Sequence, residues 1–186
     1  TEIRFMPELK LTTNIAIENY NQFSNSFQTP IGGDAKNVGG RNYRGSSKYF
    51  VVNSQQLLNY NKSFNNIHNL DVLLGHETKT TKFNYLEGSK ENFLIPGNPE
   101  LDNAAKLTGA TSYENNDALH SYMFRAQYNY DYKYYLNASV RRDGSSRFHP
   151  DTRWGNFWAV GASWRIEQED FMRSYTWLDM LKLKAS

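Results

Sequence analysis

Residues 120–142 carry the clearest pattern of hydrophobic and polar positions in the chain. Every even-numbered position from Tyr122 to Val140 is apolar or aromatic, whereas the odd-numbered positions are almost all polar. Strict alternation indicates β-strands that have one apolar and one polar face. The even-numbered set comprises Tyr122, Phe124, Ala126, Tyr128, Tyr130, Tyr132, Tyr134, Leu136, Ala138 and Val140.

This run is too long for one strand, and we place a turn at Asp131–Lys133. An odd number of loop residues keeps the apolar positions of both arms on one face, because a two-residue loop pairs positions of opposite parity. Each arm is then about nine residues long, which is the length of a tilted transmembrane β-strand.

Weaker alternation predicts further strands, for a total of about eight strands or part-strands. We place them at 1–6, 9–20, 48–62, 69–85, 156–167 and 181–186. Short turns are expected at 7–8, 65–66 and 131–133, and long loops at about 24–47, 87–118 and 144–155. Alternating short turns and long loops are typical of outer-membrane barrels, in which the short turns are periplasmic. The pattern therefore predicts an all-β, antiparallel up-and-down meander that forms an arc of a larger transmembrane β-barrel.

Composition fits this interpretation and excludes several others. Aromatic residues make up 15% of the 186 residues, yet no run approaches the 18 apolar residues of a membrane helix. The net charge of +2 without basic clusters gives no reason to expect nucleic-acid binding. The absence of cysteine removes disulfides and thiolate metal sites, and the four histidines lack metal-ligand spacing. No nucleophile motif or phosphate-binding glycine loop occurs, so we expect neither enzymatic activity nor a cofactor.

Several segments near the C-terminus, in order along the chain, resemble one known family. Tyr134–Phe148, Arg153–Gly155, Gly161–Ile166 and Trp177–Ser186 are similar to the SusC/RagA family of TonB-linked outer-membrane transporters. The chain departs from the family at Trp158, where members often have Pro, and at His149-Pro150, which replaces a small or polar pair.

The resemblance implies an importer of glycans or peptides in the outer membrane of a Gram-negative bacterium. In that family a plug domain fills a barrel of about 22 strands. A SusD-like surface lipoprotein closes the outer mouth, and the TonB complex supplies energy. Neither the plug nor the TonB-contacting segment is recognisable in these residues, so we expect part of the wall and its outer loops.

Two sets of side chains are candidates for function. The first is expected to face lipid or to form an interfacial girdle, because aromatic rings prefer the membrane interface. It comprises Tyr122, Phe124, Tyr128, Tyr130, Tyr132, Tyr134, Leu136, Val140, Trp158, Val160, Trp164 and Ile166. Sugar stacking is the alternative for the tyrosines at 128–134.

The second set is expected to contact the substrate or the lipoprotein from the outer loops. It comprises Phe93, Asn98, Arg147, Phe148 and Trp154. For Phe148 and Trp154, an upper girdle is the alternative. Glu167 and Glu169 are expected to lie at a solvated turn.

A soluble all-β carbohydrate-binding or adhesin module is the competing interpretation. In such a module the aromatic stripe packs as a sandwich core and the loops bind sugar. The alternating loop lengths favour the barrel, as does the abundance of tyrosine, since a sandwich core favours Val, Ile and Leu.

Overall fold

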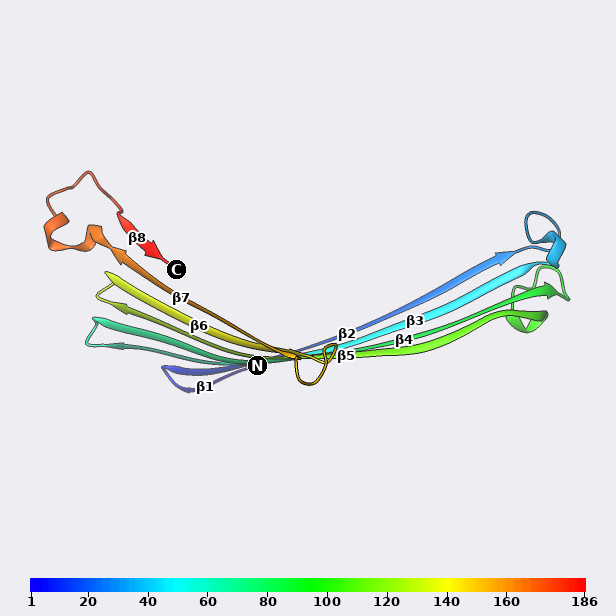
Figure 1. Ribbon diagram of the computed structural model, residues 1–186, viewed down its shortest axis with the longest axis horizontal. Coiled ribbons are helices and arrows are strands. Elements are labelled where there is room, and N and C mark those ends of the chain that lie inside the picture. The colour runs from blue at the N-terminus through cyan, green and yellow to red at the C-terminus, as the bar shows by residue number, and fades with distance from the viewer. The chain divides into compact units, whose positions relative to one another are not determined.

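The computed structural model describes residues 1–186 as eight strands and four short 3-10 helices (Figure 1). The strands are β1 (Glu2–Met6), β2 (Leu9–Gln28), β3 (Arg41–Phe64), β4 (His68–Phe93), β5 (Ala104–Tyr130), β6 (Tyr134–Ser145), β7 (Trp154–Arg165) and β8 (Lys182–Ala185). The 3-10 helices are η1 (Lys36–Val38), η2 (Leu101–Asn103), η3 (Ile166–Gln168) and η4 (Asp170–Met172).

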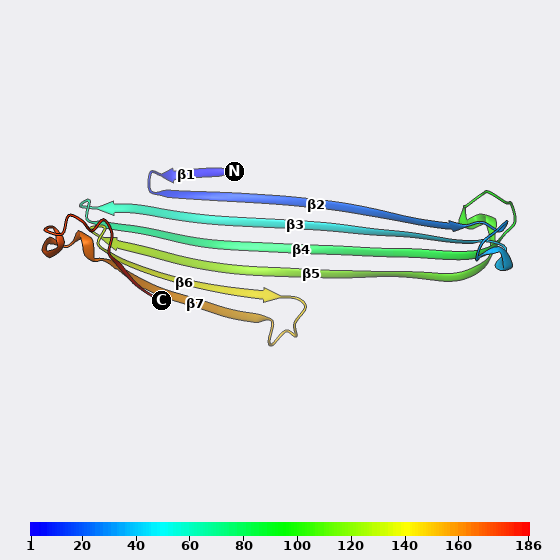
Figure 2. The same cartoon turned by 90° about the horizontal axis from the view of Figure 1, so that it is seen from above.

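The strands form one sheet in which each strand pairs with its neighbours in sequence, in the order β1 to β8. Figure 2 shows this succession, with β6 and β7 shorter than β2 to β5. The pairs β1–β2, β5–β6, β6–β7 and β7–β8 are antiparallel. The predicted all-β meander is confirmed.

The register of β5, β6 and β7 confirms the predicted parity. Tyr130 lies opposite Tyr134, which leaves 131–133 as the connecting loop. Even positions then pair with even positions across both ladders: Phe124 with Val140, and Val140 with Trp158. The apolar positions of these three strands therefore share one face, which we call the even face, and the polar positions share the odd face.

Two short turns use left-handed backbone at consecutive residues. Asn65 and Asn66 have φ of 53° and 57°, and Asp131 and Tyr132 have φ of 49° and 55°. Two consecutive positive φ values are the mark of the primed turns that match the right-handed twist of paired strands. The predicted turns at 65–66 and 131–133 are confirmed, and Tyr132 lies in the turn rather than in a strand.

Four strands are longer than predicted, so two of the expected long loops are shorter. β2 continues to Gln28 and β3 starts at Arg41, which reduces the expected loop 24–47 to 29–40. β4 continues to Phe93 and β5 starts at Ala104, which reduces the expected loop 87–118 to 94–103. These stretches are rich in Gly, Ser and Asn, but pairing with adjacent strands satisfies their backbone groups and outweighs weak β propensity.

One connection breaks the predicted alternation of loop lengths. Residues 166–181 join β7 to β8 at the same end of the strands as the short turn 131–133, since the end of β7 pairs with Tyr134. A short turn was expected at this end, but the connection is 16 residues long and contains η3 and η4. Ile166, predicted to be a lipid-facing strand residue, is the first residue of η3 instead. The loop between β6 and β7, at 146–153, is close to the predicted range of 144–155.

The chain divides into two compact units. Unit 1 comprises Thr1–Ala16, Asn53–Lys79 and Ala118–Ser186, and unit 2 comprises Ile17–Val52 and Thr80–Asp117. The only buried apolar side chains, Ala35, Phe93 and Ala104, belong to unit 2. Unit 1 is a single layer that buries no apolar residue, although a sheet normally needs a second layer to cover its apolar face.

No helix of the chain has the length and apolar character that crossing a membrane requires.

Candidate functional site

The even face of unit 1 carries most of the residues predicted to contact lipid. Leu136, Val140, Trp158 and Val160 are 49–77% exposed, although all four side chains are apolar. Near the short turns, Tyr134 stacks on Trp164 with ring centroids 6.2 Å apart, and Tyr130 lies 6.1 Å from Tyr134. Rings in contact at one end of the strands are the arrangement expected of an aromatic girdle.

The odd face of unit 1 carries a polar network across β3, β4 and β5. Asn69 donates to Asn129 at 2.9 Å, and Arg125 pairs with Asp71 at 3.6 Å. Asp71 also accepts a hydrogen bond from Asn61 at 3.2 Å. These contacts join β3, β4 and β5 on the face predicted to be polar.

The end of β6 and β7 next to the 146–153 loop contains a recess of about 430 Å³ that combines rings and charges. Arg141 donates to Asp143 at 2.8 Å and to Ser121 at 3.2 Å. The Nε of Arg153 is buried there without a hydrogen-bond partner. Phe148, a predicted substrate contact, lines the recess and is 62% exposed.

Trp154 also lines this recess, but its ring packs with the even face. It stacks on Tyr122 with centroids 6.1 Å apart, and the guanidinium of Arg142 lies 5.0 Å from its centroid. Trp154 lies opposite Gly144, where an added Cβ would be 2.7 Å from the indole. Gly144 therefore provides the space that the indole occupies. The ring of Trp154 contacts Tyr122 and Arg142, and no ring contact with Phe148 is formed.

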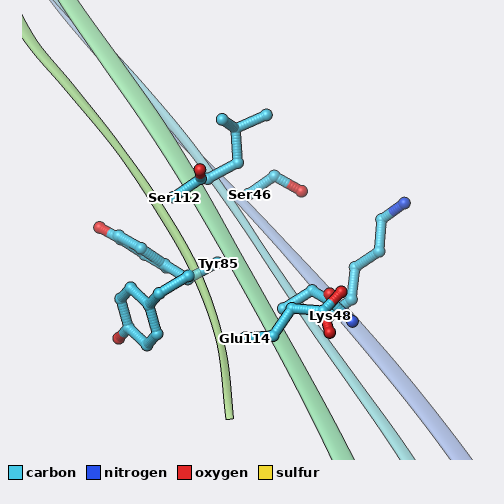
Figure 3. Close-up of a pocket in the computed structure, with 8 residues that line it drawn as sticks. Ser46, Lys48, Tyr85, Ser112 and Glu114 are labelled. Atoms are coloured by element: carbon cyan, nitrogen blue, oxygen red, sulfur yellow. The ribbon is translucent and has the colours of Figure 1, made fainter.

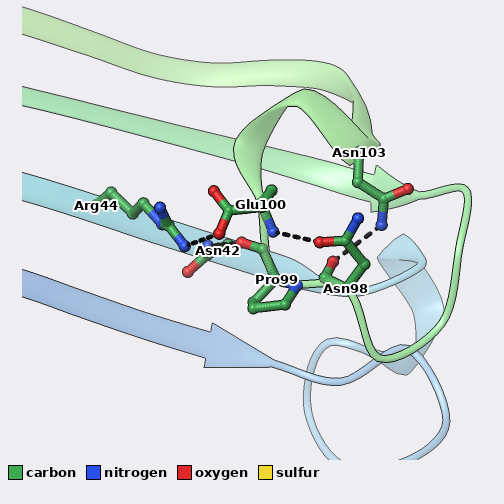
Figure 4. Close-up of polar contacts among 6 residues, drawn as sticks. All are labelled: Asn42, Arg44, Asn98, Pro99, Glu100 and Asn103. Atoms are coloured by element: carbon green, nitrogen blue, oxygen red, sulfur yellow. Dashed lines mark hydrogen bonds and ion pairs between the residues drawn. The ribbon is translucent and has the colours of Figure 1, made fainter.

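The loop tips of unit 2 hold the other predicted contact residues. Phe93 is 7% exposed and meets Phe27 edge-on, with centroids 5.2 Å apart. Asn98 accepts from the backbone amide of Glu100 through its side chain and from Asn103 through its backbone oxygen (Figure 4). Both residues therefore stabilise the loops, and the buried ring of Phe93 offers no open face to a ligand.

Charged residues tie the same end of unit 2 together. Glu91 accepts from Arg41 at 3.0 Å and from Lys106 at 3.4 Å, which joins β3, β4 and β5. The hydrogen bond from Arg41 is the main reason that the pKa of Glu91 is lowered. Arg44 pairs with Glu100 at 2.7 Å, which attaches the loop to β3 (Figure 4).

Unit 2 also has a recess of about 520 Å³ on its strands (Figure 3). Ser46, Lys48, Ser112 and Glu114 are among its lining residues. Figure 3 shows the side chains of Lys48 and Tyr85 extending to opposite sides of the strands, as expected from their parity.

Sequence reasoning missed two groupings because their members are far apart in the chain. Glu169 accepts hydrogen bonds from the Tyr134 hydroxyl and, at 2.9 Å, from the Trp164 indole. The side chain of Glu169 is 15% exposed and that of Glu167, which pairs with Arg165, is 5% exposed, so the expectation of a solvated turn is wrong for both. His76 and His120 lie with ring centroids 5.6 Å apart. No local pattern in the sequence signals either contact.

Comparison with known proteins finds relatives that match nearly the whole chain. No family model matches the chain. A TonB-dependent receptor of Formosa agariphila is 31% identical over 99% of the chain, and the match covers 18% of that receptor. The chain belongs to the SusC/RagA family of TonB-dependent receptors. The TonB-dependent receptor SusC of Bacteroides thetaiotaomicron is 30% identical over 98% of the chain, again with 18% of the receptor covered.

Solved structures of this family share the fold. The RagAB peptide transporter superposes with a TM-score of 0.88 at 24% identity, covering 98% of this chain and 21% of the matched one. The RagAB peptide importer in its open-open state gives a TM-score of 0.86 at 24% identity. This SusC/RagA chain thus spans about a fifth of the length of the receptors and transporters it matches.

Proposed function

We propose that the chain forms part of the wall and outer loops of an outer-membrane importer of oligosaccharides or peptides. It would be energised through TonB and work with a SusD-like surface lipoprotein. Family membership supports the proposal, and so do the names of the relatives, which include SusC and a peptide transporter.

The observation that carries this proposal is the exposed apolar even face of β5, β6 and β7. A single-layer sheet with Trp158 77% exposed and Leu136 56% exposed is unstable in water unless something apolar covers that face. The hydrocarbon of a bilayer provides such a cover, and it meets alternating strands of this kind in outer-membrane barrels.

Strand lengths support a membrane-spanning sheet whose longer strands extend beyond the bilayer. β6 and β7 have 12 residues each, close to what a tilted transmembrane strand needs. β2 to β5 have 20 to 27 residues, or roughly 65–90 Å of extended chain, far more than a bilayer requires. We therefore assign the surplus length of these strands, with the loops 29–40 and 94–103, to the extracellular side, where outer-membrane barrels have their long loops.

Cell fractionation and uptake test the proposal together. The full-length protein should be found in the outer membrane, run as a heat-modifiable band and co-purify with a surface lipoprotein. Deletion of its gene should abolish growth on at least one oligosaccharide or peptide source, and deletion of TonB should have the same effect. A protein that stays in the soluble fraction would contradict the proposal and favour a soluble β module.

A further inference from the structure

A row of aromatic rings crosses the four strands of unit 2. Tyr20 of β2 lies 6.4 Å from Tyr49 of β3, and Tyr49 lies 4.4 Å from Phe83 of β4, measured between centroids. Phe83 lies 5.7 Å from Tyr113 of β5, and Tyr85 lies 5.2 Å from Tyr113. These five residues, which we call the aromatic row, place one or two rings on each successive strand.

On β4 and β5 the rings of the row occupy odd-numbered positions, unlike the rings of the predicted girdle. In unit 1 the aromatic positions of β4 and β5 are even-numbered, as in His68, Tyr122 and Tyr128. In unit 2 the rings on these strands, Phe83 and Tyr113 among them, are odd-numbered. Because side chains alternate along a strand, the row does not continue the stripe that is predicted to contact lipid.

Hydrogen bonds hold the ring of Tyr85 in place. The Tyr85 hydroxyl donates to the Glu87 carboxylate, which only accepts. The Tyr43 hydroxyl lies 3.0 Å from that of Tyr85 and must therefore be the donor of the pair. The bond to Glu87 is also the main reason that the pKa of Tyr85 is raised. Tyr85 in turn contacts the ring of Tyr113, with centroids 5.2 Å apart, and rings held in advance lose little conformational freedom when a ligand stacks on them.

Three rings of the row are exposed, Phe83 and Tyr85 are half-buried, and the surroundings of the row are polar. Tyr20 is 58% exposed, Tyr49 is 42% exposed and Tyr113 is 51% exposed. Hydroxyl and amide residues occupy positions of the same parity two residues away, including Ser47, Thr81, Thr111 and Asn115. Flat rings surrounded by hydrogen-bonding groups suit a ligand that has both an apolar face and many hydroxyls.

We infer that the aromatic row is an extracellular binding site for a neutral oligosaccharide, whose sugar rings stack on Tyr49, Phe83 and Tyr113. This inference rests on the proposed function and assigns the substrate class. The C–H face of a pyranose packs on an aromatic ring, while its hydroxyls bond to tyrosine, serine and amide groups. Rings on adjacent strands allow several sugar units to be held at once.

Charge favours a neutral ligand over an acidic one. Glu87 is next to the row, and none of the three cation–π contacts in the chain involves a ring of the row. An anionic glycan would face a carboxylate with no cation over these rings.

Binding to paired variants of the purified full-length protein in detergent tests this inference. The row variant is Tyr49→Ala with Tyr113→Ala. The control variant is Phe50→Ala with Ser112→Ala, one residue away on the same strands and of the opposite parity. The probes are maltohexaose, laminarihexaose, xylohexaose and mannohexaose, with hexagalacturonate and an uncharged hexapeptide for comparison. Heat-modifiable migration verifies that each variant is folded.

We expect at least one neutral hexasaccharide to bind, with affinity about tenfold or more lower in the row variant and unchanged within about twofold in the control. Equal binding by both variants, or binding of the peptide or hexagalacturonate alone, would overturn the inference. So would loss of the co-purifying lipoprotein from the row variant with saccharide binding intact, since the row would then be a protein contact.

The outcomes separate this inference from the proposed function. A protein that resides in the outer membrane and supports uptake, but whose row variant binds normally, refutes the site and leaves the importer intact. A soluble protein whose row variant loses saccharide binding supports the site and refutes the importer.

Discussion

Glu169 shows how one side chain outside the strands joins distant parts of unit 1. It accepts from Tyr134 of β6 and Trp164 of β7, and the Lys133 ammonium lies 3.7 Å from its carboxylate. The hydrogen bond from Tyr134, followed by that from Trp164, lowers the pKa of Glu169 from its ordinary value of 4.5. The carboxylate therefore stabilises the attachment of the 166–181 link to the barrel strands.

We predict that this attachment depends on pH. Because the pKa is lower in the folded state, the stabilisation is complete above the ordinary pKa and is lost as pH falls through the lowered value. Glu169→Gln should weaken the link at pH 7 and remove this acid dependence. Protection factors for amides of 166–181, measured by hydrogen exchange from pH 7 to well below pH 4.5, check this.

Asp170→Asn is the matched control because its side chain is 79% exposed and pairs only with Arg173 at the surface. It should leave protection unchanged. Equal loss of protection in both variants at pH 7 would contradict a specific role for Glu169.

At the scale of elements, the turn between β5 and β6 contains a locally strained residue. Tyr132 has φ of 55°, a conformation that costs a non-glycine L-residue about 1–2 kcal/mol. Its hairpin is held by the long β5–β6 ladder and by the hydrogen bond from the Lys133 amide to Tyr130 at 2.9 Å. The pairing of β5 with β6 therefore fixes the conformation of the turn, even though Tyr132, its second central residue, disfavours a positive φ.

Tyr132→Gly should stabilise the folded protein by about 1 kcal/mol, because glycine adopts positive φ without steric cost. Urea unfolding of the full-length protein in lipid vesicles measures the change. Asn66→Gly, at the equivalent place in the β3–β4 turn, should give a smaller gain, since asparagine tolerates this conformation. A destabilised Tyr132→Gly protein would mean that the ring contributes more at the interface than its backbone costs.

For the whole molecule, the two faces of β7 should respond differently to charge. Val160 lies on the even face opposite Ala138, and Ala159 lies on the odd face opposite Ser139. Arginine at a lipid-facing position near the bilayer midplane costs about 2–4 kcal/mol. Val160→Arg should therefore impair folding into vesicles, whereas Ala159→Arg should have a much smaller effect.

Refolding yield into vesicles, read from heat-modifiable migration, provides the comparison. The two variants differ by one position and carry the same new charge, so any difference reports the environment of the face. Equal tolerance of both substitutions would show that the even face does not contact lipid in the assembled protein.

The sequence by itself determined the strands, their parity and the short turns. A period of two is a local property, so Tyr122 to Val140 predict their shared face without knowledge of any partner strand. The same residues carried the family resemblance, which the relatives confirm. Predicted strand ends were wrong by as much as 15 residues: the strand expected to begin at residue 119, after the loop 87–118, begins at Ala104, because polar segments become strands only when neighbours pair with them.

Tertiary structure alone decided which distant side chains meet. Phe93, at the end of β4, was predicted to contact a ligand, but its ring packs on Phe27 near the end of β2 and is buried. The contacts of Tyr49 with Phe83, and of Glu169 with Trp164, depend on the registers of strands and links, and register is a long-range property. Alternation specifies the face on which a side chain lies, whereas pairing between strands selects its neighbours.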